Sequence, residues 1–155
     1  GDPVHACRCA PLEVERYRSR VSGPLLDRID IHLEVPAVPY RELAAMPAEE
    51  SSAAVRGRVD RARQIQRQRF RDRPGLHANA RMAARDIRRH CALSAPVEEL
   101  LREAVTRLGL SARAYHRILK IARTIADLGG SEALAPNHVS EAIQYRSLDR
   151  RRIAA

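Results

Sequence analysis

Apolar residues recur at three- and four-residue steps along most of the chain beyond residue 40, the spacing of one face of an α-helix. The clearest stripe begins after Ser111, which can cap a helix, and continues to Ala126, ahead of the helix-ending pair Gly129-Gly130. Further stripes bounded by capping residues, prolines or glycines occupy residues 51–73, 83–91, 94–109 and 136–143. The pattern predicts a mainly α fold, a bundle of four to five helices between about residues 40 and 146.

A different pattern precedes the helices. Residues 29–35 alternate apolar and polar side chains, which predicts a β-strand with one buried face, and Pro36 ends it. The remaining sequence offers no partner strand, so this orphan strand either pairs with residues outside the chain or is extended without a ladder. We therefore divide the chain into a partly irregular segment, residues 1–36, and a helical domain, residues 37–155.

The charge of the chain is strongly positive. Its 155 residues include 28 Lys and Arg against 19 Asp and Glu, a formal net charge of +9, and Lys120 is the single lysine. Such a balance favours an anionic partner, nucleic acid or phosphate, although an arginine-rich surface in contact with water alone gives the same count. Aromatic residues are only 3% of the chain, so base-stacking side chains are scarce along the arginine-rich stretch 56–73.

Several classes of protein are excluded by the sequence. No apolar run approaches the length that spans a membrane, and the first residues lack the pattern of a secretory signal. Three cysteines do not make a disulfide framework, so we expect a cytoplasmic location and no membrane partner.

Two of the cysteines are candidate metal ligands. Cys7 and Cys9 form a Cys-Arg-Cys pair, and His5 is a possible third ligand. Zinc needs about four ligands, so this pair does not make a complete site, and inert thiols are the simpler interpretation. Cys91 lies on an apolar helical stripe and is expected in the core.

Nucleotide hydrolysis by the chain alone is not expected. A phosphate-binding loop needs glycines followed by Lys-Ser or Lys-Thr, whereas Lys120 lies between Leu119 and Ile121 in a predicted helix. No apolar strand ending in Asp-Glu is present to hold magnesium.

Two arginines nevertheless stand where they could contact a phosphate. Arg28 follows a Ser22-Gly23-Pro24 break and directly precedes the predicted strand, from which it could project into a neighbouring site. The alternative is a surface salt bridge from Arg28 to Asp27 or Asp30. Arg113 lies in the first turn after Ser111, where a cation opposes the helix dipole unless an anion is bound. An arginine that simply reaches into water is the equal alternative there.

The stretches Ser-Gly-Pro-Leu-Leu-Asp-Arg-Ile-Asp at 22–30 and Leu-Ser-Ala-Arg-Ala-Tyr-His-Arg-Ile-Leu-Lys-Ile-Ala-Arg at 110–123 resemble one known family. They are similar to the Mg-chelatase-like ATPases of bacteria, the YifB/ComM competence-protein group of the AAA+ superfamily. The closing Asn-His-Val-Ser-Glu-Ala-Ile-Gln-Tyr-Arg at 137–146 also fits, so the resemblance covers nearly the whole chain.

This resemblance implies the C-terminal piece of a longer protein, with residues 1–36 a remnant of an α/β ATPase core and residues 37–155 its helical lid. Arg28 then corresponds to the arginine finger that reaches a neighbouring subunit's nucleotide, and Arg113 to the second sensor arginine. Cys7 and Cys9 correspond to half of a four-cysteine cluster, so zinc is possible. ATP and Mg2+ would be cofactors of the longer protein, with none expected in this chain alone.

The resemblance also implies the partners: neighbouring subunits of a homo-oligomeric ring, and DNA, on which the ring would act as a motor or helicase linked to branch migration in natural transformation. Two other hypotheses compete with this one. The positive charge favours a free-standing basic helical DNA-binding module, and the paired helices allow an interaction bundle without nucleotide chemistry.

Overall fold

The computed structural model describes residues 8–33, 35, 37–38, 40–41 and 50–146, and these are helical wherever they are regular. Two short helices, α1 (Pro11–Arg18) and α2 (Gly23–Leu26), come first. The main bundle follows and consists, in chain order, of α4 (Ser52–Arg69), the 3-10 turn η1 (Asn79–Arg81), α5 (Ala84–His90), α6 (Ala95–Leu108), α7 (Ala112–Leu128) and α8 (Pro136–Gln144). The predicted mainly α bundle is confirmed.

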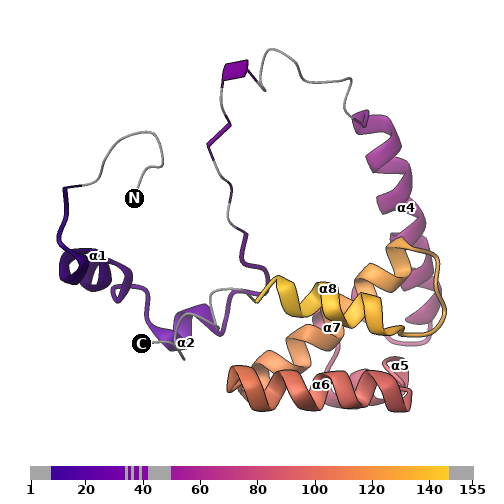
Figure 1. Cartoon of the computed structure of the whole chain (residues 1–155). Coiled ribbons are helices and arrows are strands. Elements are labelled where there is room, and N and C mark those ends of the chain that lie inside the picture. The colour runs from indigo at the N-terminus through magenta and orange to yellow at the C-terminus, as the bar shows by residue number, and fades with distance from the viewer. Residues whose placement is uncertain (1–7, 34, 36, 39, 42–49, 147–155) are drawn as a thin grey trace.

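Helix α7 is the centre of the bundle, because it packs against α8, α4, α5 and η1, while α6 packs against α8 (Figure 1). Its apolar stripe is fully buried at Ile118, Ala122 and Ala126. The rest of the core is almost entirely aliphatic, and it includes Phe70, the single phenylalanine of the chain. Removing these apolar side chains from water is what holds the helices together.

Several predicted helix boundaries are confirmed by their caps. The hydroxyl oxygens of Ser51 and Ser111 accept hydrogen bonds from the N–H groups of Ala54 and Ala114, at 3.3 and 3.1 Å. Helix α6 ends at Gly109, whose φ of 53° is a left-handed conformation that glycine adopts without steric cost. These local signals explain why α4 and α7 begin, and α6 ends, where the sequence indicates. Helix α4 ends earlier than predicted, at Arg69, and Ser94 begins α6 without a hydrogen bond from its side chain.

The orphan strand is absent from the described residues, which contain no strand at all. The expected buried face is instead exposed, with Ile29, Ile31 and Leu33 41%, 47% and 69% accessible. The buried residue is His32, from the polar face. Its backbone N–H donates to the backbone carbonyl oxygen of Tyr145 at 2.8 Å. No second strand of the described residues lies beside the segment, so within this chain it forms no ladder.

Two smaller expectations are also corrected. Ser22 begins a helix instead of only breaking one, because its hydroxyl accepts from the N–H of Leu25 and starts the single turn of α2. On α4, Val55 and Val59 are exposed, and only Ala62 and Gln66 of that helix are buried. The first half of α4 extends past the other helices of the bundle, so no described helix covers it (Figure 1).

Cys7 and its possible co-ligand His5 lie outside the described residues.

Candidate functional site

Arg113 lies in the first turn of α7, two residues after the cap Ser111, as the sequence predicted. Its side chain is exposed and makes no hydrogen bond or ion pair with any other residue that the structure describes. The first turn of a helix also presents backbone N–H groups without intrahelical partners. An exposed guanidinium beside such a turn can bind an anionic group such as a phosphate.

Arg28 lies just after α2, in a turn closed by backbone hydrogen bonds from its own N–H to Leu25 and from Ile29 to Leu26. Its guanidinium is exposed and donates to the carbonyl oxygen of Pro24 at 3.0 Å. The alternative of a salt bridge to Asp27 or Asp30 is not what the structure contains, since both carboxylates face other arginines. Arg28 therefore has no carboxylate partner among the described residues.

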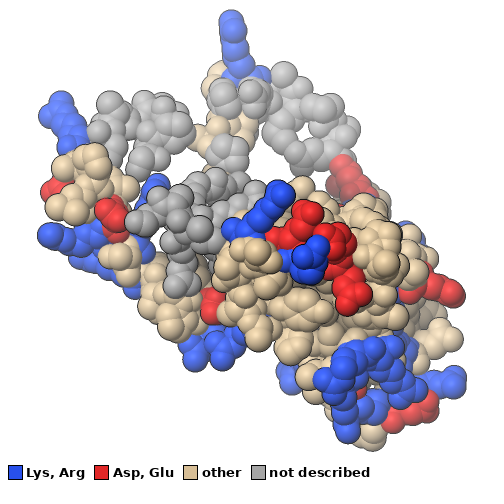
Figure 2. All heavy atoms as spheres, turned by 60° about the horizontal axis from the view of Figure 1, so that its bottom comes forward, with Lys and Arg blue, Asp and Glu red and all other residues tan. Residues whose placement is uncertain are grey.

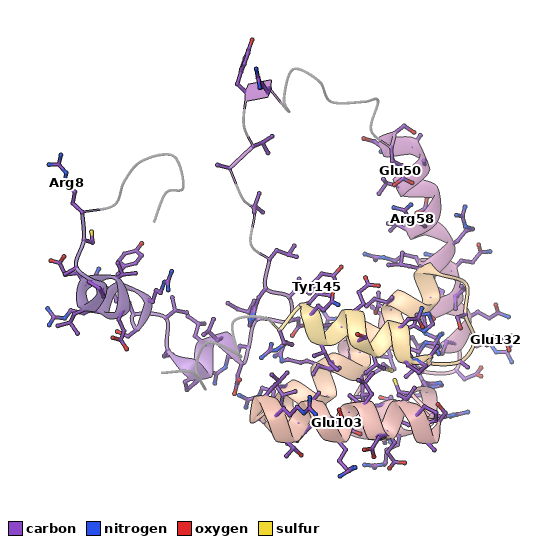
Figure 3. All side chains as sticks on the ribbon, viewed as in Figure 1. Arg8, Glu50, Arg58, Glu103, Glu132 and Tyr145 are labelled. Carbon is purple, nitrogen blue, oxygen red and sulfur yellow. The ribbon has the colours of Figure 1, made fainter. Side chains whose placement is uncertain are left out.

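The turn that carries Arg28 is fastened to the bundle by two arginines that the sequence analysis did not single out. Arg117, on α7, forms an ion pair with Asp30. Arg146, just after α8, lies 3.7 Å from Asp27 and donates to the carbonyl oxygen of Ile29 at 2.5 Å. Figure 3 shows the labelled Tyr145 at this end of α8, beside the chain that follows α2.

The electrostatics show that these groups share one environment. Burial lowers the pKa of Arg117, the nearby Arg146 and Arg28 lower it further, and Asp27 opposes them. Arg146 is fully buried, and the side chain of Arg117 is 23% exposed. Arg113 precedes Arg117 by four residues, so the two side chains lie on the same face of α7. The structure thus brings Arg28 to the helix that carries Arg113.

A second polar cluster fixes α7 itself. Asp127 accepts two hydrogen bonds from Arg69 of α4, at 2.6 and 2.5 Å, one from Asn79 at 2.8 Å and one from Arg123 at 3.1 Å. Arg123 also donates to the carbonyl oxygens of Ser131 and Glu132, in the loop before α8. Four segments of the chain are therefore tied to one buried carboxylate, so α7 is a firm base for the arginines at its other end.

The metal prediction gains no support from the described residues. Cys9 is exposed, and no group of three or more His, Cys, Asp or Glu side chains lies close enough in the described part of the chain to hold a metal ion. Two thiolates do not complete a zinc site, and Cys7 lies outside the described residues, so the possible half-cluster stays a prediction. Cys91 is buried in the core, as predicted.

The sequence carried little sign of Arg117, Arg146 and Asp127. An arginine that pairs with a distant carboxylate has the same local pattern as one that faces water. The one usable signal was the spacing of Arg123 and Asp127, four residues apart on the apolar stripe of α7, where an unpaired charge would be costly. No helix of the described residues has the length and apolar character needed to cross a bilayer.

Comparison with known proteins gives a consistent set of relatives. Residues 49–146 match the family described as Magnesium chelatase, subunit ChlI C-terminal, and residues 1–43 match Magnesium chelatase, subunit ChlI. The chain is 42% identical to Competence protein ComM of Haemophilus influenzae over 92% of its own length and 27% of that protein.

It is 42% identical to the uncharacterized protein YifB of Escherichia coli, over 92% of this chain and 28% of that protein. An uncharacterized protein of Mycobacterium bovis is 34% identical over 94% of this chain and 29% of its own length. The chain thus spans little more than a quarter of the length of these curated relatives. Because the family match covers the helical bundle from α4 to Arg146, the chain belongs to the magnesium chelatase ChlI C-terminal family, in its ComM/YifB branch.

Proposed function

We propose that this chain is the C-terminal region of a longer AAA+ ATPase, in which Arg113 contacts the γ-phosphate of bound ATP and Arg28 reaches the nucleotide of a neighbouring subunit. The observation that carries the proposal is the state of these two side chains. Both are exposed, and neither pairs with a carboxylate among the described residues. The family match supports it, because it covers the segments on which both arginines lie.

The chemistry of the two arginines differs. Arg113, on the helical domain, would bind ATP held by its own subunit, so loss of the γ-phosphate would change the contact between that domain and the nucleotide. Arg28 would place a planar cation against the charge that develops as the phosphate bond breaks in the next subunit. ATP supplies the bond that is cleaved, and Mg2+ would offset the phosphate charge from the part of the protein that carries the phosphate-binding loop.

The proposed setting is a homo-oligomeric ring that moves DNA, with branch migration in natural transformation as its role. The name Competence protein, carried by one relative, supports the link to DNA uptake. The finger role proposed for Arg28 implies a ring, since a finger that acts on a neighbour needs a head-to-tail contact between identical subunits.

Turnover of ATP by the longer protein tests this proposal. Arg28→Ala and Arg113→Ala should each lower kcat by about a thousandfold or more, the usual effect of losing a phosphate-facing arginine, while the circular dichroism spectrum stays unchanged. Arg107→Ala is the matched control, because Arg107 is an arginine of α6 with 78% of its side chain exposed. Wild-type turnover in both test variants would remove the proposal.

The second candidate is a basic DNA-binding module that needs no nucleotide. It is favoured by the exposed arginines of α4, which are Arg56, Arg58, Arg61, Arg63 and Arg67, although Arg58 pairs with Glu50. Against it, Figure 2 shows basic side chains at separate places on the face of the molecule that it draws, with acidic ones among them. The module predicts that this chain alone binds duplex DNA with a steep salt dependence, and absence of binding at low salt would exclude it.

A further inference from the structure

Both carboxylates that flank Arg28 in the sequence are occupied by arginines of the bundle. Asp30 pairs with Arg117 of α7, and Asp27 faces Arg146 at 3.7 Å. Either carboxylate could otherwise neutralise Arg28, because it lies only one or two residues away. Arg117 and Arg146 thus leave Arg28 exposed and without a carboxylate partner among the described residues.

The same contacts fix the position of the turn. The guanidinium of Arg146 donates a hydrogen bond to the backbone carbonyl oxygen of Ile29, the residue after Arg28, at 2.5 Å. Two residues further on, the N–H of His32 donates to the carbonyl oxygen of Tyr145 at 2.8 Å, and the His32 side chain is buried. Backbone and side-chain contacts together therefore dock residues 27–32 on α7 and on the end of α8.

The docking joins Arg28 to the helix that carries Arg113. Arg117 lies one helical turn after Arg113 on the same face of α7. Helix α7 is itself anchored by the buried carboxylate of Asp127 at its other end. A rotation of α7 would carry the docked turn with it, because packed elements shift as units and do not deform continuously.

We propose that Arg117 and Arg146 are positioning residues, which hold the turn of Arg28 on the Arg113 helix and keep Asp27 and Asp30 from pairing with Arg28. This inference rests on the proposed function, since it assigns the arrangement to the finger and the sensor arginine of one subunit. Its consequence is mechanical. The presence or absence of a γ-phosphate at Arg113 of one subunit changes where that subunit presents Arg28 to its neighbour.

The docking is tested first in this 155-residue chain, by hydrogen–deuterium exchange of the amides between residues 28 and 33. Arg117→Gln and Asp30→Asn should each raise the exchange rate of the His32 amide about tenfold or more, since its hydrogen bond forms only in the docked segment. The charge-swapped pair Asp30→Arg with Arg117→Asp should restore most of the protection, and Arg107→Gln should leave it unchanged. Equal exchange in all variants would overturn the docking.

The positioning role is tested next by ATP turnover of the longer protein. Arg117→Gln should lower kcat about tenfold or more with little change in KM, and the charge-swapped pair should recover most of it. A drop in kcat that the swap does not rescue, or no drop at all, would overturn the role even where the exchange results hold. Arg28→Ala separates this failure from failure of the proposed function, because full activity of that variant would remove the finger itself.

Discussion

Arg69 and Asp127, 58 residues apart in the chain, form a two-pronged ion pair with N···O distances of 2.6 and 2.5 Å. The carboxylate is completely buried, and the arginine is 14% exposed. Asn79 and Arg123 donate to the same carboxylate, so every segment that meets there depends on one charge. The pair connects the end of α4 to the end of α7, and it fixes the helix whose other end carries the proposed site.

Asp127→Asn should therefore destabilise the fold strongly. It would leave two largely buried arginines, Arg69 and Arg123, without their counter-charge, which costs about 3–5 kcal/mol. Urea unfolding at neutral pH measures the loss. Asp72→Asn is the matched control, because Asp72 is 87% exposed and should change the free energy of unfolding by less than about 0.5 kcal/mol.

Should Asp127→Asn fail to fold, Asn79→Ala offers a milder probe of the same cluster. It removes one donor to Asp127 and should cost about 1–3 kcal/mol. If both variants unfold with the same free energy as the Asp72→Asn control, the stabilising role assigned to the Asp127 carboxylate is contradicted.

Asp86 should make stability depend on acid. Its carboxylate accepts from the N–H of Ala83 at 3.0 Å, capping α5, and from Arg73 at 2.7 Å. The Ala83 N–H lowers the pKa of Asp86 below its ordinary 3.8, with Arg73 and Arg85 adding to the effect against the opposing burial. The stabilisation is therefore complete above pH 3.8 and is lost as the pH falls through the lower folded-state value.

The melting temperature of wild type and Asp86→Asn, followed from neutral pH to about pH 2, checks this prediction. Wild type should have the higher melting temperature at neutral pH. The difference in melting temperature between the two proteins should become smaller below pH 3.8. A difference in melting temperature that is constant over the whole pH range would show that the charge of Asp86 does not contribute to stability.

Cys91 should make stability fall in alkali. Burial raises the pKa of its thiol from 9.0 to about 11. Between these values the unfolded chain ionises while the folded chain does not, so the free energy of unfolding falls as the pH rises, by roughly 2–3 kcal/mol at most. Chemical unfolding of wild type and Cys91→Ala between pH 9 and 11 isolates the effect. Parallel curves for the two proteins would contradict it.

The helices could be predicted from the sequence because their signals are local. Ser51 and Ser111 cap the N-termini of α4 and α7, and Gly109 ends α6 in a left-handed conformation. The apolar stripe of α7 is buried, as its spacing indicates. The partners of the arginines could not be predicted, because they come from distant parts of the chain. Arg146 and Ile29 are 117 residues apart, and nothing near either residue indicates the other.

The segment 29–35 shows the same limit in another form. Alternation predicts which side chains share a face, but not which face is covered. His32 is buried here while Ile31 and Leu33 are exposed, because the side chains that contact the bundle are those of the polar face, Asp30 and His32. The alternating pattern therefore predicted correctly that the two faces of the segment differ in burial. It predicted the wrong face to be buried in this chain.

Mixing two inactive variants of the longer protein tests the central claim most directly. If Arg113 acts on the nucleotide of its own subunit and Arg28 on that of its neighbour, an equal mixture of Arg28→Ala and Arg113→Ala assembles complete sites where one variant adjoins the other. About a quarter of the sites in a head-to-tail ring would then be complete, so ATP turnover should return to about that fraction of wild type. Turnover that stays as low in the mixture as in either variant alone would contradict the account.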